Sequence, residues 1–182
     1  MRTRLSRGLI WRAAVVAVVA AATVVLGVRA TAPAPTTTNT TTTGWELPRL
    51  GTSGDLRLAD LRGRPLVVDF FASWCTACQG ELPGFATVAR QLTGAVTFAG
   101  VDSQENGDGL SMARTYGIDS WPLAVDVGGS QASGLHDALG TRGMPVTAFY
   151  DSGGHLLEVV PGAISEDDLK ARLRSLYGVT VA

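Results

Sequence analysis

The chain has 182 residues, of which 46% are hydrophobic and 17% are charged, and its formal net charge at pH 7 is −1. This length predicts one globular domain with an added segment. Residues 1–30 hold five of the 15 basic residues and no acidic residue, which leaves ten basic and 16 acidic residues, a net charge of −6, for the rest. An acidic domain of this kind argues against nucleic acid as a partner.

The first 30 residues have the pattern of an export segment. Residues 2–12 carry four arginines, and residues 13–28 are an uncharged run rich in Ala and Val. A basic stretch followed by such a run predicts a signal peptide or a signal-anchor helix, with its positive end in the cytoplasm. We therefore expect the rest of the chain outside the cytoplasm, anchored in the membrane by about residues 9–28 or secreted after cleavage.

Residues 31–43, TAPAPTTTNTTTT, predict a flexible tether. Eight of these residues are Thr, and the stretch has no large apolar side chain with which to build a core. Such a composition favours an extended, unpacked segment. Residues 44–182 are then the folded domain.

The domain begins with a predicted hairpin and a buried strand. Turn residues at Gly51 and 53–55 separate short apolar stretches between Trp45 and Asp60, which favours a hairpin extension at the start of the domain. The run PLVVDFF at residues 65–71 is almost entirely apolar. A short run of this kind predicts a strand that is buried on both faces.

Helices and strands alternate through the rest of the domain. Apolar residues at helical spacing, a glycine that can end a helix (Gly117) and a capping box at Ser165 predict helices, while short apolar runs predict strands. The predicted helices cover about 76–92, 110–116, 131–139 and a last stretch from residue 166, and the predicted strands cover 96–101, 123–125, 146–150 and 155–160. This order predicts an α/β fold with a mixed sheet.

The only two cysteines, Cys75 and Cys78, lie in the stretch FFASWCTACQGELP. A structural zinc site needs four ligands, and His136 and His155 lie far from the pair in the sequence. A structural disulfide gains little from so short a loop, because its stabilisation grows with loop length. Cys75 instead follows a buried strand and begins a helix, where unpaired amides and the helix dipole stabilise a thiolate. The pattern predicts a redox pair in which Cys75 attacks and Cys78 resolves the mixed disulfide.

The stretches VVDFFASWCTACQGELP and GMPVTAFYDSGG resemble the thioredoxin superfamily, and more narrowly its membrane-tethered TlpA/ResA/CcmG (DsbE-like) branch. In that branch the cysteine pair is typically followed by a Glu and a Pro, matched here by Glu81 and Pro83. The phrase DLRGRP before the first core strand is similar as well. The resemblance implies a thioredoxin-like α/β fold, with a central mixed β-sheet flanked by helices and an N-terminal hairpin extension.

The same resemblance implies how substrates bind. Met144 and Pro145 match the family's cis-proline loop, in which the proline packs beside the cysteines and the nearby backbone pairs with an extended substrate segment. Trp74 is expected to shield the disulfide and to line the docking surface. The dipeptide Thr76–Ala77 departs from relatives that often have Pro before the second cysteine. Because this dipeptide tunes the reduction potential, the direction of electron flow stays open.

Two acidic residues are expected to transfer protons. Asp69 matches the buried Asp of thioredoxin, although many tethered relatives have Asn there. A carboxylate buried in a strand is expected to have a raised pKa and to shuttle the proton of Cys78. Glu81 matches a Glu that lies near the thiols in the tethered branch.

The two histidines, His136 and His155, are expected on the surface without a role.

The leading hypothesis is an extracytoplasmic thiol–disulfide oxidoreductase that reduces disulfides of exported proteins, for example those of apocytochrome c. A membrane electron-donor protein would recharge it, and the resemblance implies no organic cofactor and no metal. One alternative is an oxidase that forms disulfides in exported proteins with the same fold and motif. Another is a Cu(I)-handling module, because two thiolates can hold Cu(I). Related Sco-type proteins, however, use a wider cysteine spacing and a distal His.

Overall fold

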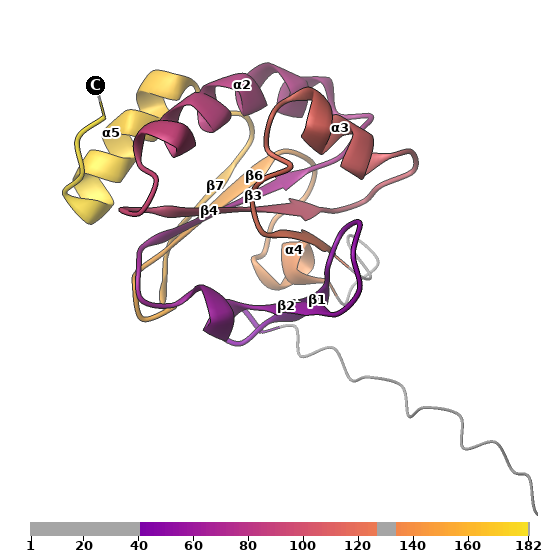
Figure 1. Cartoon of the computed structure of the whole chain (residues 1–182), viewed down its shortest axis with the longest axis horizontal. Helices are drawn as coiled ribbons and strands as arrows, with labels where there is room; N and C mark the ends of the chain where they lie inside the picture. Colours follow the sequence, from indigo (N-terminus) through magenta and orange to yellow (C-terminus); the bar gives the residue numbers. More distant parts are fainter. Residues whose placement is uncertain (1–40, 127–133, 182) are drawn as a thin grey trace, which may run out of the picture. The chain divides into compact units, whose positions relative to one another are not determined.

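The computed structural model describes residues 41–126 and 134–181 (Figure 1). The predicted export segment 1–30 and most of the predicted tether 31–43 lie outside the described residues. Across the part that is described, we find no helix with both the length and the apolar character needed to cross a membrane.

A five-stranded mixed sheet forms the centre of the domain, with the strand order β5-β4-β3-β6-β7. Strands β3, β4 and β5 are parallel to one another, whereas β6 and β7 are antiparallel to their neighbours. The strands are β3 (Leu66–Phe71), β4 (Thr97–Asp102), β5 (Leu123–Val125), β6 (Val146–Tyr150) and β7 (Leu156–Pro161). The predicted α/β fold with a mixed sheet is therefore confirmed, and the predicted strand bounds are correct to within one residue.

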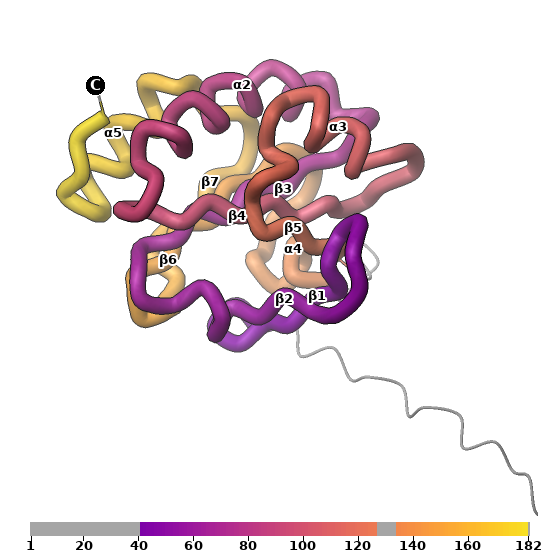
Figure 2. The backbone as a smooth tube through the Cα atoms, viewed as in Figure 1, coloured from indigo at the N-terminus to yellow at the C-terminus, as the bar shows by residue number. Residues whose placement is uncertain are grey.

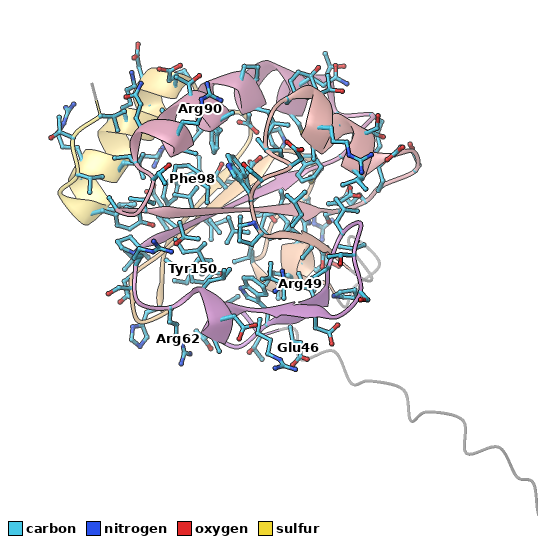
Figure 3. The ribbon with its side chains drawn as sticks, viewed as in Figure 1. Glu46, Arg49, Arg62, Arg90, Phe98 and Tyr150 are labelled. Carbon is cyan, nitrogen blue, oxygen red and sulfur yellow. A yellow bond between two sulfur atoms is a disulfide. The ribbon has the colours of Figure 1, made fainter. Side chains whose placement is uncertain are left out.

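Helices cover one face of the sheet, and the hairpin with a short helix covers the other (Figures 1 and 2). On the first face lie α2 (Thr76–Gln91), α3 (Gly109–Thr115) and α5 (Glu166–Tyr177). On the second lie β1 (Glu46–Pro48), β2 (Asp55–Arg57), the 3-10 helix η1 (Leu58–Leu61) and α4 (Leu135–Ala138). Phe98 and Tyr150 belong to the two separate core layers, one on each face (Figure 3).

The central strand β3 is buried on both faces, as its apolar sequence predicts. All six of its residues are buried, and it has hydrogen-bonded partners on both sides. Val68 and Phe70 pack in the layer toward the hairpin, while Val67 and Phe71 pack toward the helices. Because side chains alternate along a strand, Asp69 also points to the helical face. This single charged residue of β3 is thus placed inside the core.

The predicted N-terminal hairpin is confirmed, and it is an integral part of the core. Strands β1 and β2 are antiparallel, with Leu47 opposite Leu56. Trp45, Leu47, Leu56 and Leu58 are all buried in one cluster with residues of the central sheet. Burying each side chain of this size contributes about 1.5–3 kcal/mol. The hairpin therefore covers the second face of the sheet.

The last helix begins and ends at the signals that the sequence carries. The hydroxyl of Ser165 accepts a hydrogen bond from the N–H of Asp168 at 3.1 Å and so caps the first turn of α5. Acidic residues in that turn oppose the positive end of the helix dipole. The helix ends at Gly178, whose φ of 69° lies in the left-handed region that favours glycine. Leu169 and Leu173 are buried against the sheet.

The sequence predicts His136 on the surface, but this prediction is wrong, because His136 is fully buried. The N–H groups of Leu135 and His136 donate to the carboxylate of Asp126 at 2.7 and 3.1 Å, which holds α4 under the sheet. The ring of Phe70 lies edge-on to the imidazole, with 5.9 Å between ring centroids. His155, in contrast, is exposed in the turn before β7, as predicted.

Candidate active site

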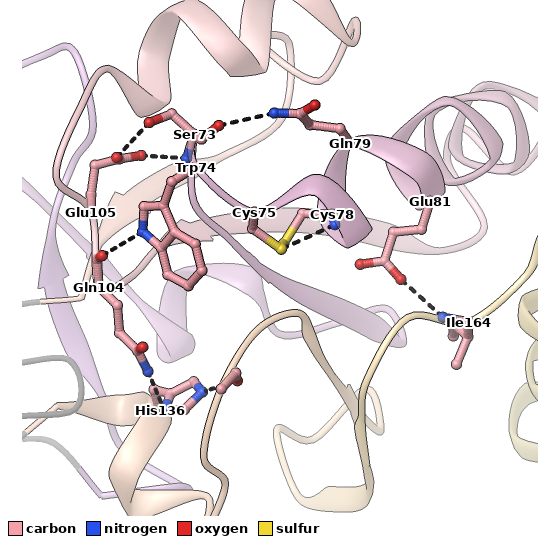
Figure 4. The surroundings of a disulfide bond; sticks show 11 residues. Ser73, Trp74, Cys75, Cys78, Gln79, Glu81, Gln104, Glu105, His136 and Ile164 are labelled. Atoms are coloured by element: carbon pink, nitrogen blue, oxygen red, sulfur yellow. Dashed lines mark hydrogen bonds between the residues drawn. A yellow bond between two sulfur atoms is a disulfide. The ribbon is translucent and has the colours of Figure 1, made fainter.

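The two cysteines lie where the central strand passes into the longest helix. The N–H of Cys75 donates to the carbonyl of Ala72 at 3.0 Å, and Cys75 is the N-cap residue of α2. The N–H of Cys78 donates to the sulfur of Cys75 at 3.1 Å. This amide belongs to the first helical turn, where N–H groups lack partners within the helix. The cysteines are buried and joined as a disulfide, and a reduced Cys75 thiolate would be stabilised at this helix end (Figure 4).

A carboxylate from the neighbouring strand end holds the loop before the cysteines. Both the N–H and the hydroxyl of Ser73 donate to Glu105 at 2.6 Å. The N–H groups of Asn106 and Gly107 donate to the same carboxylate at 2.8 and 2.7 Å. Burial by itself raises the pKa of Glu105, but these four hydrogen bonds outweigh it and hold the pKa below its ordinary value. Glu105 is therefore an ionised clamp on this loop.

Trp74 presents its side chain at the surface beside Cys75. It is 45% exposed, which is unusual for so large an apolar side chain in this domain. Its indole N–H donates to the carbonyl of Gln104 at 2.8 Å, so the ring is fixed at one end (Figure 4). A fixed and exposed aromatic ring is suited to contact another protein. That Trp74 contacts substrates stays a prediction.

Asp69 lies under the helix that carries the cysteines. It is fully buried, and it pairs in the sheet with Gly100 of β4 and Thr147 of β6. Among the described residues, neither carboxylate oxygen of Asp69 has a hydrogen-bond partner, and neither does the hydroxyl of Thr147. Burial raises the pKa of Asp69 well above its ordinary value, and the negative charge of Glu81 raises it further. Asp69 therefore holds a proton far more readily than an exposed aspartate.

Glu81 lies one helical turn after Cys78 on α2 and is 6% exposed. One carboxylate oxygen accepts a hydrogen bond from the N–H of Ile164 at 3.0 Å, while the other oxygen has no partner in the part of the chain that the structure describes. Burial raises the pKa of Glu81 to about 7, although the bond from Ile164 opposes this shift. Glu81 can thus take up and release a proton near neutral pH, and the raised pKa of Asp69 makes it a second proton-binding group in this part of the core.

The loop before β6 has the cis peptide bond that the resemblance implies, between Met144 and Pro145. Pro145 directly precedes Val146, which pairs with Phe70 near the end of β3. The cis-proline loop therefore lies next to the strand end from which the cysteine loop starts. Met144 is half-buried and packs against the cluster that contains both cysteines. The substrate-binding roles of Met144 and Pro145 stay predictions.

The structure brings the predicted site residues together on β3, α2 and the loop before β6. Sequence reasoning missed three residues that hold this arrangement: Gln104, Glu105 and His136. A signal for two of them exists, because the polar stretch DSQEN begins at the end of β4. The carboxyl ends of parallel neighbours such as β3 and β4 meet at one edge of the sheet, where functional residues gather. No comparable local pattern points to His136.

Comparison with known proteins agrees with this geometry. The thioredoxin family profile matches residues 57–131. The thiol–disulfide oxidoreductase ResA from Oceanobacillus iheyensis is 27% identical over 122 residues, which cover 66% of this chain and 62% of ResA. The thiol:disulfide interchange protein DsbE from Pseudomonas fluorescens biotype C is 29% identical over 137 residues, which cover 72% of this chain and 73% of DsbE.

Solved structures show the same likeness. The structure of MTB DsbF has a TM-score of 0.64 and 27% identity, and the match covers 74% of this chain and 96% of DsbF. The exposed lipoprotein thioredoxin Etrx1 from Streptococcus pneumoniae has a TM-score of 0.60 and 27% identity, with 73% of this chain and 99% of Etrx1 covered.

The matched profile, the fold and the cysteine pair at the start of α2 identify a thioredoxin domain in this chain. Within the superfamily it matches the ResA/DsbE branch of thiol–disulfide oxidoreductases, as the sequence resemblance implies.

Proposed function

We propose that this chain is a thiol–disulfide oxidoreductase that works outside the cytoplasm and reduces disulfides of exported proteins. The observation that carries the proposal is the position of Cys75 at the N-terminus of α2, between the strand that holds the buried Asp69 and the helix that holds the buried Glu81, two carboxyl groups with raised pKa values. A helix end favours the attacking thiolate, and a nearby base can take the proton of the second thiol.

The reaction proceeds in two exchanges. The thiolate of Cys75 attacks one sulfur of a substrate disulfide, so that a mixed disulfide forms and the first substrate thiolate leaves. Cys78 then gives its proton to Asp69 or Glu81, and its thiolate attacks the sulfur of Cys75. The mixed disulfide breaks, the second substrate thiolate leaves, and the Cys75–Cys78 disulfide forms. Two electrons have passed from the chain to the substrate, and a dithiol donor must return them.

The proposed substrates and partners are supported by the surroundings of the cysteines and by the resemblance to the ResA/DsbE branch. An extended segment of an exported protein would pair with the backbone at Met144 and Pro145, with Trp74 alongside. Apocytochrome c, whose haem-binding cysteines must be reduced, is the example that the ResA/DsbE resemblance favours. The electron donor would be a membrane protein with a dithiol. Neither an organic cofactor nor a metal enters the reaction.

The proposed location rests on the first 43 residues. The arginines of 2–12 and the apolar run of 13–28 support a signal peptide or signal anchor, and residues 31–43 support a tether. Among the structural relatives, Etrx1 is itself described as an exposed lipoprotein. The domain would then act outside the cytoplasm, near the membrane or after release from it.

The reduction potential of the full chain tests the direction of electron flow. The chain is equilibrated with dithiothreitol or glutathione buffers, and free thiols are trapped with an alkylating mass tag. A potential near or below that of thioredoxin, about −270 mV, supports a reductant. A potential towards that of a strong oxidant, about −120 mV, contradicts it and supports an oxidase instead. Stable one-to-one Cu(I) loading that is lost in Cys75→Ser would support the copper-handling alternative.

A further inference from the structure

The imidazole of His136 is buried under the sheet, and both of its nitrogens lie near polar groups. Nε2 is 2.9 Å from the carbonyl oxygen of Gly143, and Nδ1 is 3.4 Å from the side-chain nitrogen of Gln104. A carbonyl can only accept a hydrogen bond, so Nε2 carries the proton and donates. In the neutral ring Nδ1 is then an acceptor, which suits the amide N–H of Gln104. One tautomer therefore satisfies both contacts.

Gln104 extends this contact to the cysteine loop. Its backbone carbonyl accepts a hydrogen bond from the indole N–H of Trp74 at 2.8 Å, while its side-chain amide reaches His136 (Figure 4). The φ of Gln104 is 56°, in the left-handed region that residues other than glycine rarely adopt. A residue held in that region needs its surroundings to fix it. The result is a continuous path from Trp74 through Gln104 and His136 to Gly143.

Each end of this path is next in sequence to one part of the redox site: the cysteine pair at one end and the cis-proline loop at the other. Trp74 directly precedes Cys75, and Gly143 directly precedes the cis-linked Met144 and Pro145. The middle of the path is anchored as well, because the backbone N–H of His136 donates to the buried Asp126. Movement of the cis-proline loop relative to Trp74 would thus break a hydrogen bond of His136.

We propose that His136 is a positioning residue that holds the loop at Gly143–Pro145 at a fixed spacing from Trp74, and so shapes the site for a protein substrate. This inference rests on the proposed function, in which a substrate segment binds between these two parts. Packing alone does not require an imidazole here. A buried polar ring is costly unless its nitrogens are hydrogen-bonded, and here both nitrogens have partners.

Three substitutions of His136 in the full chain separate its two contacts. His136→Phe keeps a ring against Phe70 and loses both hydrogen bonds. His136→Gln places an amide N–H near the position of Nε2, which retains the bond to Gly143. His136→Asn places its amide near the position of Nδ1, which retains only the longer contact to Gln104. If the bond to Gly143 positions the loop, Gln is the conservative variant and the other two lose function.

Two rates are measured for each variant: reaction of the reduced chain with the disulfides of insulin, and reduction of the oxidised chain by dithiothreitol. We expect Phe and Asn to lower the insulin rate about fivefold or more, the effect of losing one intramolecular hydrogen bond, and Gln to retain most of it. The dithiothreitol rate should change less than twofold, because a small thiol needs no docking site. Equal loss of both rates, or no loss in the folded variants, would overturn the proposal.

His155→Gln is the matched control, since His155 is exposed and lies outside this path. It should change neither rate. A wild-type chain that reacts with neither probe would contradict the proposed function itself, a different outcome from a selective loss. The tautomer gives a test without any variant or activity. Nitrogen NMR of the wild-type chain should show His136 protonated at Nε2 and not at Nδ1, and the opposite tautomer would overturn the proposal.

Discussion

Asp69 in the central strand and Glu81 on the helix above it are close enough that the negative charge of Glu81 raises the pKa of Asp69. Both are buried, and three of their four carboxylate oxygens have no hydrogen-bond partner within residues 41–126 and 134–181. Two acids in this situation titrate as a pair, because the ionisation of one disfavours the ionisation of the other. The redox pair therefore has two proton-binding groups whose charge states depend on each other.

The substitution Glu81→Gln should stabilise the domain at high pH. Burial raises the pKa of Glu81 from 4.5 to about 7, so the folded state binds a proton more tightly than the unfolded state. Its ionisation thus lowers the stability as the pH rises from 4.5 towards 7. Gln stays neutral and can still accept the N–H of Ile164. We expect the variant to match the wild type at about pH 4 and to exceed it by up to about 3 kcal/mol at about pH 8.

Urea unfolding at the two pH values measures this difference. Asp119→Asn removes an exposed acid and serves as the control, which should show little change with pH. A stability gain for Glu81→Gln that is as large at low pH as at high pH would contradict the assigned burial of an ionising carboxylate.

The substitution Asp69→Asn should slow the second exchange more than the first. Asn cannot take the proton of Cys78, and a positioned general base contributes about 100-fold or more to a proton-transfer step. Single-turnover reaction with a labelled peptide disulfide separates formation of the mixed disulfide from its resolution. We expect slower resolution with little change in formation.

If both carboxyl groups can serve as the base, the double substitution with Glu81→Gln will slow resolution more than the two single effects combined. Equal slowing of both steps would argue against Asp69 as the base for Cys78.

Substitutions of the two cysteines should differ in whether they trap a covalent complex with a protein substrate. In Cys78→Ser, Cys75 still attacks, but nothing resolves the mixed disulfide, so a covalent complex with a protein substrate should accumulate. In Cys75→Ser no complex should form, because Cys78 is fully buried within α2. Non-reducing gels and intact mass spectrometry distinguish the two outcomes. Trapping by Cys75→Ser alone would reverse the assigned roles.

The substitution Glu105→Gln should destabilise the domain at neutral pH, an effect of opposite sign to that of Glu81→Gln. Hydrogen bonds from Ser73, Gly107 and Asn106 hold the pKa of Glu105 below 4.5. Its stabilisation is therefore present above that pH and is lost as the pH falls through the lowered pKa. At neutral pH we expect a loss of about 1–2 kcal/mol, less than the roughly 1.5–3 kcal/mol of a buried hydrogen bond to a charged group, because solvent screens this half-buried carboxylate.

Thermal unfolding of Glu105→Gln at several pH values is the measurement. Ser73→Ala removes only the hydroxyl bond and keeps the backbone N–H, so it should cost less. If Glu105→Gln is as destabilising in acid as at neutral pH, the ionised clamp is not the source of its stability.

The elements that the sequence predicts best are those whose signal is local. The apolar run of β3, the helical spacing in α2 and the capping box at Ser165 are each contained within a few residues. The cis bond before Pro145, in contrast, is expected only from the family resemblance. Because strand and helix signals arise from such near neighbours, the fold and the position of the cysteines could be predicted.

The burial of His136 could not be predicted in this way. It lies in a four-residue helix without apolar periodicity, and its side-chain partner Gln104 is 32 residues away in the sequence. The clamp between Ser73 and Glu105 likewise joins residues 32 positions apart. Such contacts depend on how the strands are ordered in the sheet. They follow from the tertiary structure and leave no pattern in a single stretch.

The central position of β3 in the sheet also determines which parts of this domain unfold locally. A strand with partners on both sides and all six residues buried is released only when the whole sheet unfolds, so its amides should exchange with solvent last. The N–H of Cys75 is tied to Ala72, directly after that strand. Native-state fluctuations should therefore loosen the peripheral loops long before they disturb the base of the cysteine loop. The thiols can meet a partner repeatedly while the strand beneath them stays in place.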